Sequence, residues 1–142
     1  MTEAESRAER DYLWEHFKFN ADQRLRAFYF FVVFSAFADG GVFTAIEKHA
    51  GGALFLLVGA FVCLLAVAFF LIDRRSQDLL RLSVPGLKVY EQKFPRHSRL
   101  FALEQSRAPK LVRYTVAFGM LFAAQLAFGL GVVIYGARVL WR

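Results

Sequence analysis

The sequence has little that could build a metal centre or a disulfide scaffold. Only one of its 142 residues is a cysteine, and a single cysteine cannot form a disulfide within the chain. The three histidines, His16, His49 and His97, are scattered and lack the spacing of zinc or haem ligands. We therefore expect neither a metal site nor a cofactor.

Signals for secretion, for β-strands and for catalysis are also missing. The first residues mix acids and bases without an apolar run behind a basic start, so we expect no cleavable signal peptide and a cytosolic amino terminus. No segment has strand patterning, and no Walker loop, G-x-S-x-G or H-E-x-x-H motif occurs. We expect an all-α protein that is not an enzyme and has no evident small-molecule substrate.

The sequence does contain long apolar segments. Hydrophobic residues make up 57% of the chain, and residues 50–72 and 114–137 contain no charge at all. As helices, these two segments would each be about 34–36 Å long, more than the roughly 30 Å of a bilayer's hydrocarbon core. A soluble bundle would need more amphipathic helix to cover them than the rest of the chain can supply. Both segments are therefore predicted to be transmembrane helices.

A third apolar segment, residues 27–46, contains one charge, Asp39, followed by Gly40 and Gly41. It is either a complete span or a shorter segment that ends at the glycines. The basic residues favour a complete span, because five Lys/Arg precede it, ten lie in residues 73–113, and three crossings place both groups on one side. The positive-inside rule then predicts a cytoplasmic amino terminus and a periplasmic carboxyl terminus, across the cell inner membrane.

These patterns predict an all-α integral membrane protein with three transmembrane helices, an amphipathic N-terminal helix and a short helical cytosolic segment between helices 2 and 3. Leu13, Phe17, Ala21 and Leu25 recur every four positions, which indicates an amphipathic helix that runs on into the first span. The predicted segments are the N-terminal helix (1–26), the three spans (27–46, 50–72 and 114–137), the basic cytosolic segment (73–113) and a short outer tail (138–142).

Three prolines divide the cytosolic segment. We expect Pro85, with Gly86 after it, to break or sharply kink the helix that leaves the second span. A short helix would then end at Pro95, Ser98 would cap a third one, and Pro109 suits the first turn of the last span.

The basicity of the protein is concentrated in residues 73–113, whose ten bases and four acids give it a charge of +6. Three interpretations remain open: ordinary positive-inside bias, docking on anionic lipid headgroups, or an RNA- or nucleotide-binding face that uses Tyr90, Phe94 and Phe101 as stacking rings. The residues of this basic cytosolic face are Arg74, Arg75, Arg81, Lys88, Lys93, Arg96 and Arg99.

Few polar side chains lie within the predicted spans. Gln125 stands midway along the last span, where an amide normally finds an interhelical partner; it either joins helices or lines a pore. Asp39 either faces water or a partner within the membrane, or lies where the helix frays at the two glycines and so reaches the outer interface. Ser35, one turn before it, is the polar residue nearest in sequence. We take Ser35, Asp39 and Gln125 as the candidate polar or pore-lining residues.

Small residues recur every four positions along the last span, which is typical of closely packed membrane helices. This small stripe consists of Thr115, Gly119, Ala123, Ala127 and Gly131. Its partner is either the second span of the same chain, where Gly59, Cys63 and Ala66 offer a matching surface, or a neighbouring copy. We expect a homo-oligomer that uses at least one such face.

One pattern, Arg10 and His16 with five residues between them, matches the Arg-x(4–6)-His signature of HEPN-type ribonucleases. Six residues correspond to about 240° of helix rotation, so the two side chains would not share a face of one helix. We therefore expect no ribonuclease activity from this pair.

Four short motifs give a family resemblance: FKFNADQRL at residues 17–25, FYFF at 28–31, IDRRSQDLL at 72–80 and VYE at 89–91. In these motifs the chain resembles small prokaryotic defence-associated membrane proteins, among them membrane accessory proteins of RNA-targeting CRISPR effectors and membrane effectors of some retrons. The resemblance implies a membrane-perturbing effector, a homo-oligomeric pore that depolarises the inner membrane when infection is sensed. The chain departs from these proteins at Pro85, where they usually continue a helix.

Two functions therefore remain open. The chain is either an oligomeric membrane effector that permeabilises the bilayer, or an adaptor that holds a cytosolic protein or RNA partner at the membrane through its basic face. The lipid bilayer is a partner in both.

Overall fold

The computed structural model describes residues 2–101, 103 and 114–141. Three long α-helices make up most of it: α1 (Glu3–Glu47), α2 (Gly52–Glu91) and α4 (Tyr114–Leu140). A 3-10 turn, η1 (Arg96–Ser98), follows α2, and the described residues contain no strand. The all-α prediction is confirmed, and each long helix is long and apolar enough to cross a membrane.

Local sequence signals set both ends of α1. A capping box starts the helix: the Glu5 amide donates to the Thr2 hydroxyl, and the Thr2 amide donates to the Glu5 carboxylate at 2.7 Å. At the other end, His49 adopts a positive φ of 53° and reverses the chain within a few residues, so that α2 returns along α1. As expected, the N-terminal helix and the first apolar segment form one continuous helix.

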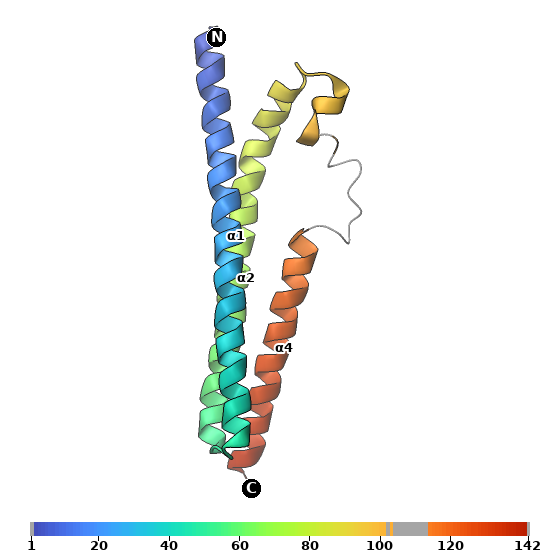
Figure 1. Cartoon of the computed structure of the whole chain (residues 1–142). Coiled ribbons are helices and arrows are strands. Elements are labelled where there is room, and N and C mark those ends of the chain that lie inside the picture. The colour runs from blue at the N-terminus through green and yellow to red at the C-terminus, as the bar shows by residue number, and fades with distance from the viewer. Residues whose placement is uncertain (1, 102, 104–113, 142) are drawn as a thin grey trace.

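The lengths of the helices divide the molecule into two parts. The 45 residues of α1 and the 40 of α2 correspond to about 68 and 60 Å, twice the thickness of a hydrocarbon core. The 27 residues of α4 correspond to about 40 Å and lie beside only the apolar parts of the other two helices (Figure 1). Residues 3–26 and 73–91 therefore extend beyond the apolar part as a pair of helices, which we call the stalk.

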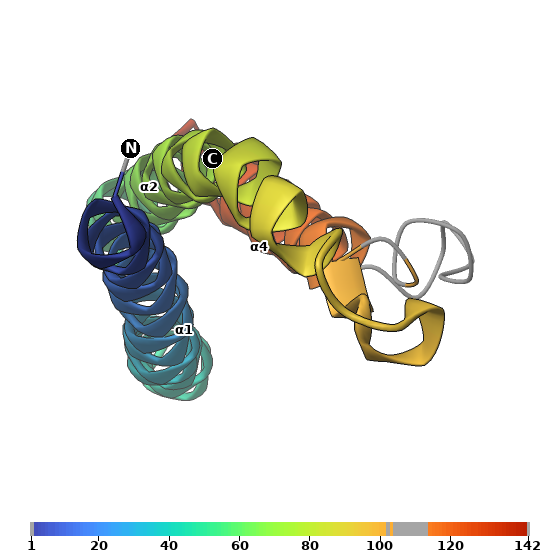
Figure 2. The same ribbon diagram turned by 90° about the horizontal axis from the view of Figure 1, so that it is seen from above.

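Helix α2 lies between the other two helices (Figure 2), and most close approaches in the fold involve it. Two buried apolar clusters fill the apolar part. One consists of Phe31, Leu65, Phe118 and Phe122, and the other of Val42, Ala45, Phe55 and Val132. Helices α1 and α4 meet mainly through long side chains, such as the stacked rings of Phe28 and Phe118, whose centroids are 3.7 Å apart.

Glycines let α2 and α4 approach closely at two levels. A Cβ atom added at Gly52 would lie 2.5 Å from the backbone oxygen of Gly136. One added at Gly59 would lie 3.0 Å from the backbone oxygen of Gly129. The two glycines of each helix are seven residues apart. In the antiparallel pair, Gly52 therefore lies opposite Gly136 and Gly59 opposite Gly129.

Of the two effects predicted for Pro85, a break or a sharp kink, the break is wrong, because α2 continues through Pro85 to Glu91. Pro85 lies on the exposed side of α2, where water can satisfy the carbonyl group that its ring leaves without a donor. Gly86 packs against α1, where an added Cβ would lie 2.6 Å from Leu13 Cδ1. The expected separate helix before Pro95 is therefore the end of α2. Ser98 belongs to η1, and Pro109 lies outside the described residues.

The buried stripe of the first half of α1 also differs from the prediction. Leu13, Phe17 and Ala21 are half-buried, but Leu25 is 56% exposed. Asn20 is 4% exposed and takes the inward position instead. The stalk is therefore held by polar as well as apolar contacts, which a search for apolar periodicity cannot detect.

Candidate functional site

Asp39 and Gln125 meet within the apolar part of the molecule. The Gln125 Nε2 group donates a 2.7 Å hydrogen bond to Asp39 Oδ1 and so joins α1 to α4. Because α1 continues to Glu47, the alternative in which the helix frays at Asp39 does not hold. The hydroxyl of Ser35, one turn before Asp39 in α1, is buried without a hydrogen-bond partner. Asp39 and Gln125 therefore form a polar pair among apolar side chains, and the Ser35 hydroxyl is bonded to neither of them.

A second polar cluster ties the three helices together where the stalk begins. Arg24 Nε donates to Asp73 Oδ1 at 2.6 Å, and the two side chains are only 13% and 8% exposed. Gln77 donates to the other oxygen of Asp73 at 2.6 Å. The guanidinium of Arg24 also reaches α4, since it donates to the Thr115 hydroxyl at 3.5 Å and lies 5.0 Å from the centroid of the Phe118 ring. We call this group the inner cluster.

Sequence reasoning missed the inner cluster, although a signal was present. Arg24 comes shortly before the first apolar segment and Asp73 directly after the second. In an antiparallel hairpin, these two positions lie at the same level, so opposite charges there are typical of an interhelical ion pair.

Farther along the stalk, polar contacts continue between α1 and α2. The His16 ring bonds the buried hydroxyl of Ser83, and the side-chain amide of Asn20 donates to the His16 carbonyl at 2.7 Å. Arg10 instead pairs with its neighbour Asp11 at 2.8 Å on the exposed surface. The structure therefore does not bring Arg10 and His16 together into one site.

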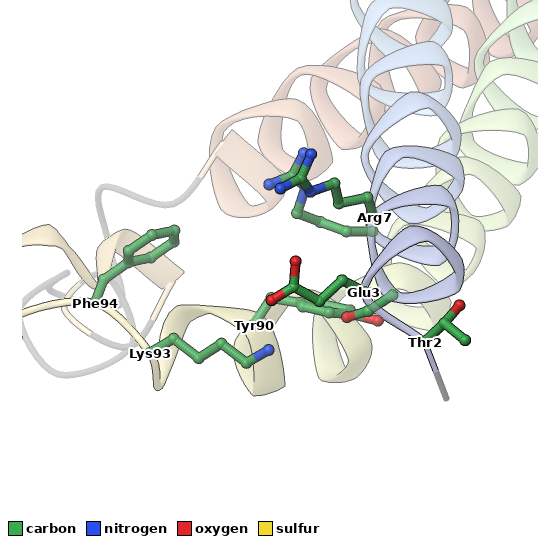
Figure 3. Close-up of a pocket in the computed structure, with 8 residues that line it drawn as sticks. Thr2, Glu3, Arg7, Tyr90, Lys93 and Phe94 are labelled. Carbon is green, nitrogen blue, oxygen red and sulfur yellow. The ribbon is translucent and has the colours of Figure 1, made fainter.

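The far end of the stalk has two adjoining clefts. The first, about 420 Å³, is lined by acidic, basic and aromatic side chains (Figure 3), among them Glu3, Arg7, Tyr90 and Lys93. The Tyr90 hydroxyl donates a 2.8 Å hydrogen bond to Glu9, and this bond to the carboxylate raises the pKa of the phenol above its usual 10.0. The cleft mixes both signs of charge and contains no cluster of metal-ligand side chains among the described residues.

The second cleft, about 390 Å³, is more apolar and is lined by α1, by the end of α2 and by the residues that follow α2. Trp14, Phe94 and Phe101 line it together with Glu91, which accepts a 3.0 Å hydrogen bond from the Phe101 amide. Of the three rings proposed for base stacking, Phe94 and Tyr90 line both clefts, and Phe101 lines this one.

The predicted basic face is divided in the structure. Five of its members are exposed: Arg74, Arg75, Arg81, Lys93 and Arg96. Lys88 and Arg99 are half-buried, and Arg99 donates to the carbonyl groups of Phe94 and Gln92, both at 2.9 Å. Arg99 therefore closes the end of α2 rather than offering its charge to a partner.

The small stripe of α4 does not form the packing surface within the chain. A Cβ added at Gly119 or Gly131 would meet nothing within 4 Å, and Ala123 and Ala127 are exposed. The contact with α2 uses Gly129 and Gly136 instead, neither of which the four-residue pattern included. The signal for these two was the matching seven-residue spacing of glycines in both spans. Gly59 does pack against α4, but it meets Gly129 and Val133 rather than the small stripe that it was predicted to match.

Comparison with curated proteins shows a similarity to a protein named for its association with a CD-NTase. The chain is 26% identical over 95 residues to CD-NTase-associated protein 19 of Escherichia coli, a match that covers 66% of this chain. It spans only 62% of that protein's length. No family model matches the sequence, and no solved structure matches it significantly. The similarity supports a relation to defence-associated proteins, and it does not single out CRISPR accessory proteins or retron effectors.

Proposed function

We propose that copies of this chain assemble in the inner membrane into a pore that permeabilises or depolarises it as part of antiviral defence. The observation that carries the proposal is the hydrogen bond between the Asp39 carboxylate and the Gln125 amide. All other residues of the three apolar segments are uncharged. Ionisable side chains at membrane depth are costly and mark ion or substrate paths. The similarity to a CD-NTase-associated protein supports the defence role.

A pore requires several copies, because three helices cannot surround a water-filled channel. The small stripe supports such an assembly, since Ala123, Ala127 and Gly131 are exposed in the single chain and small residues let membrane helices approach closely. In this proposal, the stalk projects into the cytoplasm and the short turn after α1 faces the periplasm, as the Lys/Arg distribution favours.

The alternative function is that of a non-enzymatic adaptor, which the two clefts at the end of the stalk favour. In that role, the exposed bases and the rings of Tyr90 and Phe94 would hold a cytosolic protein or RNA, and the helices would only anchor the complex. An adaptor needs no polar site within the bilayer, so the two functions differ in what Asp39 and Gln125 contribute.

The pore function is tested by the double variant Asp39→Ala with Gln125→Leu. Dye uptake or ion flux in cells that overexpress the protein should fall on the order of tenfold, because the path through ~30 Å of hydrocarbon loses its polar side chains. Membrane insertion, checked by fractionation, should not change. The matched control is Thr44→Val, because this hydroxyl in the same helix bonds only the carbonyl of Gly40.

A second control addresses the cytosolic side. The pair Arg10→Ala with His16→Ala removes the side chains that a ribonuclease site in the stalk would need, and it also removes the contact of His16 with Ser83. Compared at equal amounts of inserted protein, this variant should keep the flux of the unaltered protein. Full flux in the Asp39/Gln125 variant, together with its loss in the Arg10/His16 variant, would overturn the pore and move the active site to the stalk.

A further inference from the structure

We propose that the pore selects cations over anions, and that Asp39 and Gln125 form the site where a permeating cation is held. This inference rests on the proposed pore function and specifies which ions pass. It follows from the sign of the charge, the free oxygens and the distance to the basic face.

The charged side chain within the apolar segments is an acid. Across the apolar segments 27–46, 50–72 and 114–137, Asp39 is the only Asp, Glu, Lys, Arg or His. A symmetric assembly repeats it once per copy and so forms a ring of carboxylates. Rings of Asp or Glu favour cations in channels, whereas anion pores use rings of Arg or Lys.

The atoms around Asp39 are suited to a cation. Its hydrogen bond with Gln125 uses one carboxylate oxygen and one N–H of the amide. Among the described residues, the second carboxylate oxygen of Asp39 and the carbonyl oxygen of Gln125 form no hydrogen bond within the protein. Carboxylate and carbonyl oxygens are ligands that hard cations prefer. An anion would need N–H donors, and the carboxylate already holds one of those of Gln125.

The basic face does not reverse this preference. Arg24 in the inner cluster, which marks the start of the stalk, precedes Asp39 by 15 positions in α1, which is about 22 Å along a helix. Its own charge is paired with Asp73. The exposed bases lie farther out on the stalk, and at physiological salt the Debye length is only about 8 Å. Their field is therefore screened before it reaches Asp39.

Selectivity is measured by reconstituting the purified protein in planar bilayers under a tenfold KCl gradient. The current should reverse near the potassium equilibrium potential. In Asp39→Asn, which keeps an oxygen for the Gln125 hydrogen bond, the reversal potential should move at least halfway to zero while current persists. Asp39→Glu, which keeps the negative charge, should give the reversal potential of the unaltered protein. Glu47→Gln, which removes a carboxylate beyond the apolar segment, should also leave the reversal potential unchanged.

The outcomes separate this inference from the pore itself. A current that reverses near zero or toward the chloride potential in the unaltered protein would overturn cation selectivity and leave the pore standing. The absence of any current would contradict the proposed pore function, and the inference with it. Replacing K⁺ by a large organic cation under a pH gradient identifies the permeant ion: a current that persists is carried by protons, and one that vanishes by the metal cation.

Discussion

Replacing Asp73 with alanine should lower the free energy of unfolding by about 3–5 kcal/mol, because it leaves the charge of Arg24 buried without its partner. Both side chains are almost fully buried, so solvent does not screen the pair. Gln77 would lose its acceptor as well. The measurement is unfolding by heat or denaturant of the protein in mild detergent, followed by circular dichroism.

Asp11→Ala is the matched control for this prediction. Asp11 forms an equally direct pair with Arg10, but the two side chains are 47% and 62% exposed, and such surface pairs contribute less than about 1 kcal/mol. The double variant Arg24→Leu with Asp73→Leu should recover part of the lost stability, since it leaves no unpaired buried charge. Equal effects of Asp73→Ala and Asp11→Ala would show that the inner cluster does not hold the helices together.

Leucine at Gly129 or Gly136 should separate α2 from α4 and destabilise the chain by about 1–3 kcal/mol or more, as expected for overpacking. At Gly129, a Cβ would lie 3.0 Å from the backbone nitrogen of Cys63, and at Gly136, it would lie 2.8 Å from that of Leu56. Backbone atoms cannot turn away as a flexible side chain can. The same unfolding experiment measures the effect.

Leucine at the small stripe should act differently. Gly119 has open space around it and Ala123 and Ala127 are exposed in the single chain, so the triple change Gly119→Leu, Ala123→Leu and Ala127→Leu should leave the unfolding of the monomer unchanged. It should lower the mass of the assembly in detergent, because leucine separates backbones that small residues allow to meet. An unchanged mass and thermal stability would mean that the stripe faces lipid.

Two of the apolar helices were predictable because charge-free segments longer than 20 residues have few structural alternatives. The third, residues 27–46, contains Asp39 and was predicted from the Lys/Arg distribution. The course of α2 past Pro85 was not predictable, because the effect of a proline depends on whether its side of the helix is exposed. The same holds for Leu25 and Asn20, whose places depend on how α2 lies against α1. Local patterns report an element's preference, and packing decides which face turns inward.

The polar pair was only partly predictable. Its members could be selected as costly side chains within apolar segments, but their pairing could not, because Asp39 and Gln125 are 86 residues apart in sequence. The register that brings them together is set by the hairpin and by the glycine contacts between α2 and α4. The seven-residue glycine spacing is visible within each span, but the register follows only when the two spans are compared with each other.

The most direct test is to determine how many copies form the complex and whether they enclose a channel. The protein, extracted in mild detergent or in native lipid, would be measured by native mass spectrometry and imaged by electron cryomicroscopy. We expect a closed ring of identical copies with a continuous lumen and Asp39 facing it. A monomer, a simple heterodimer, or a ring whose Asp39 side chains face away from any lumen would contradict the proposed pore.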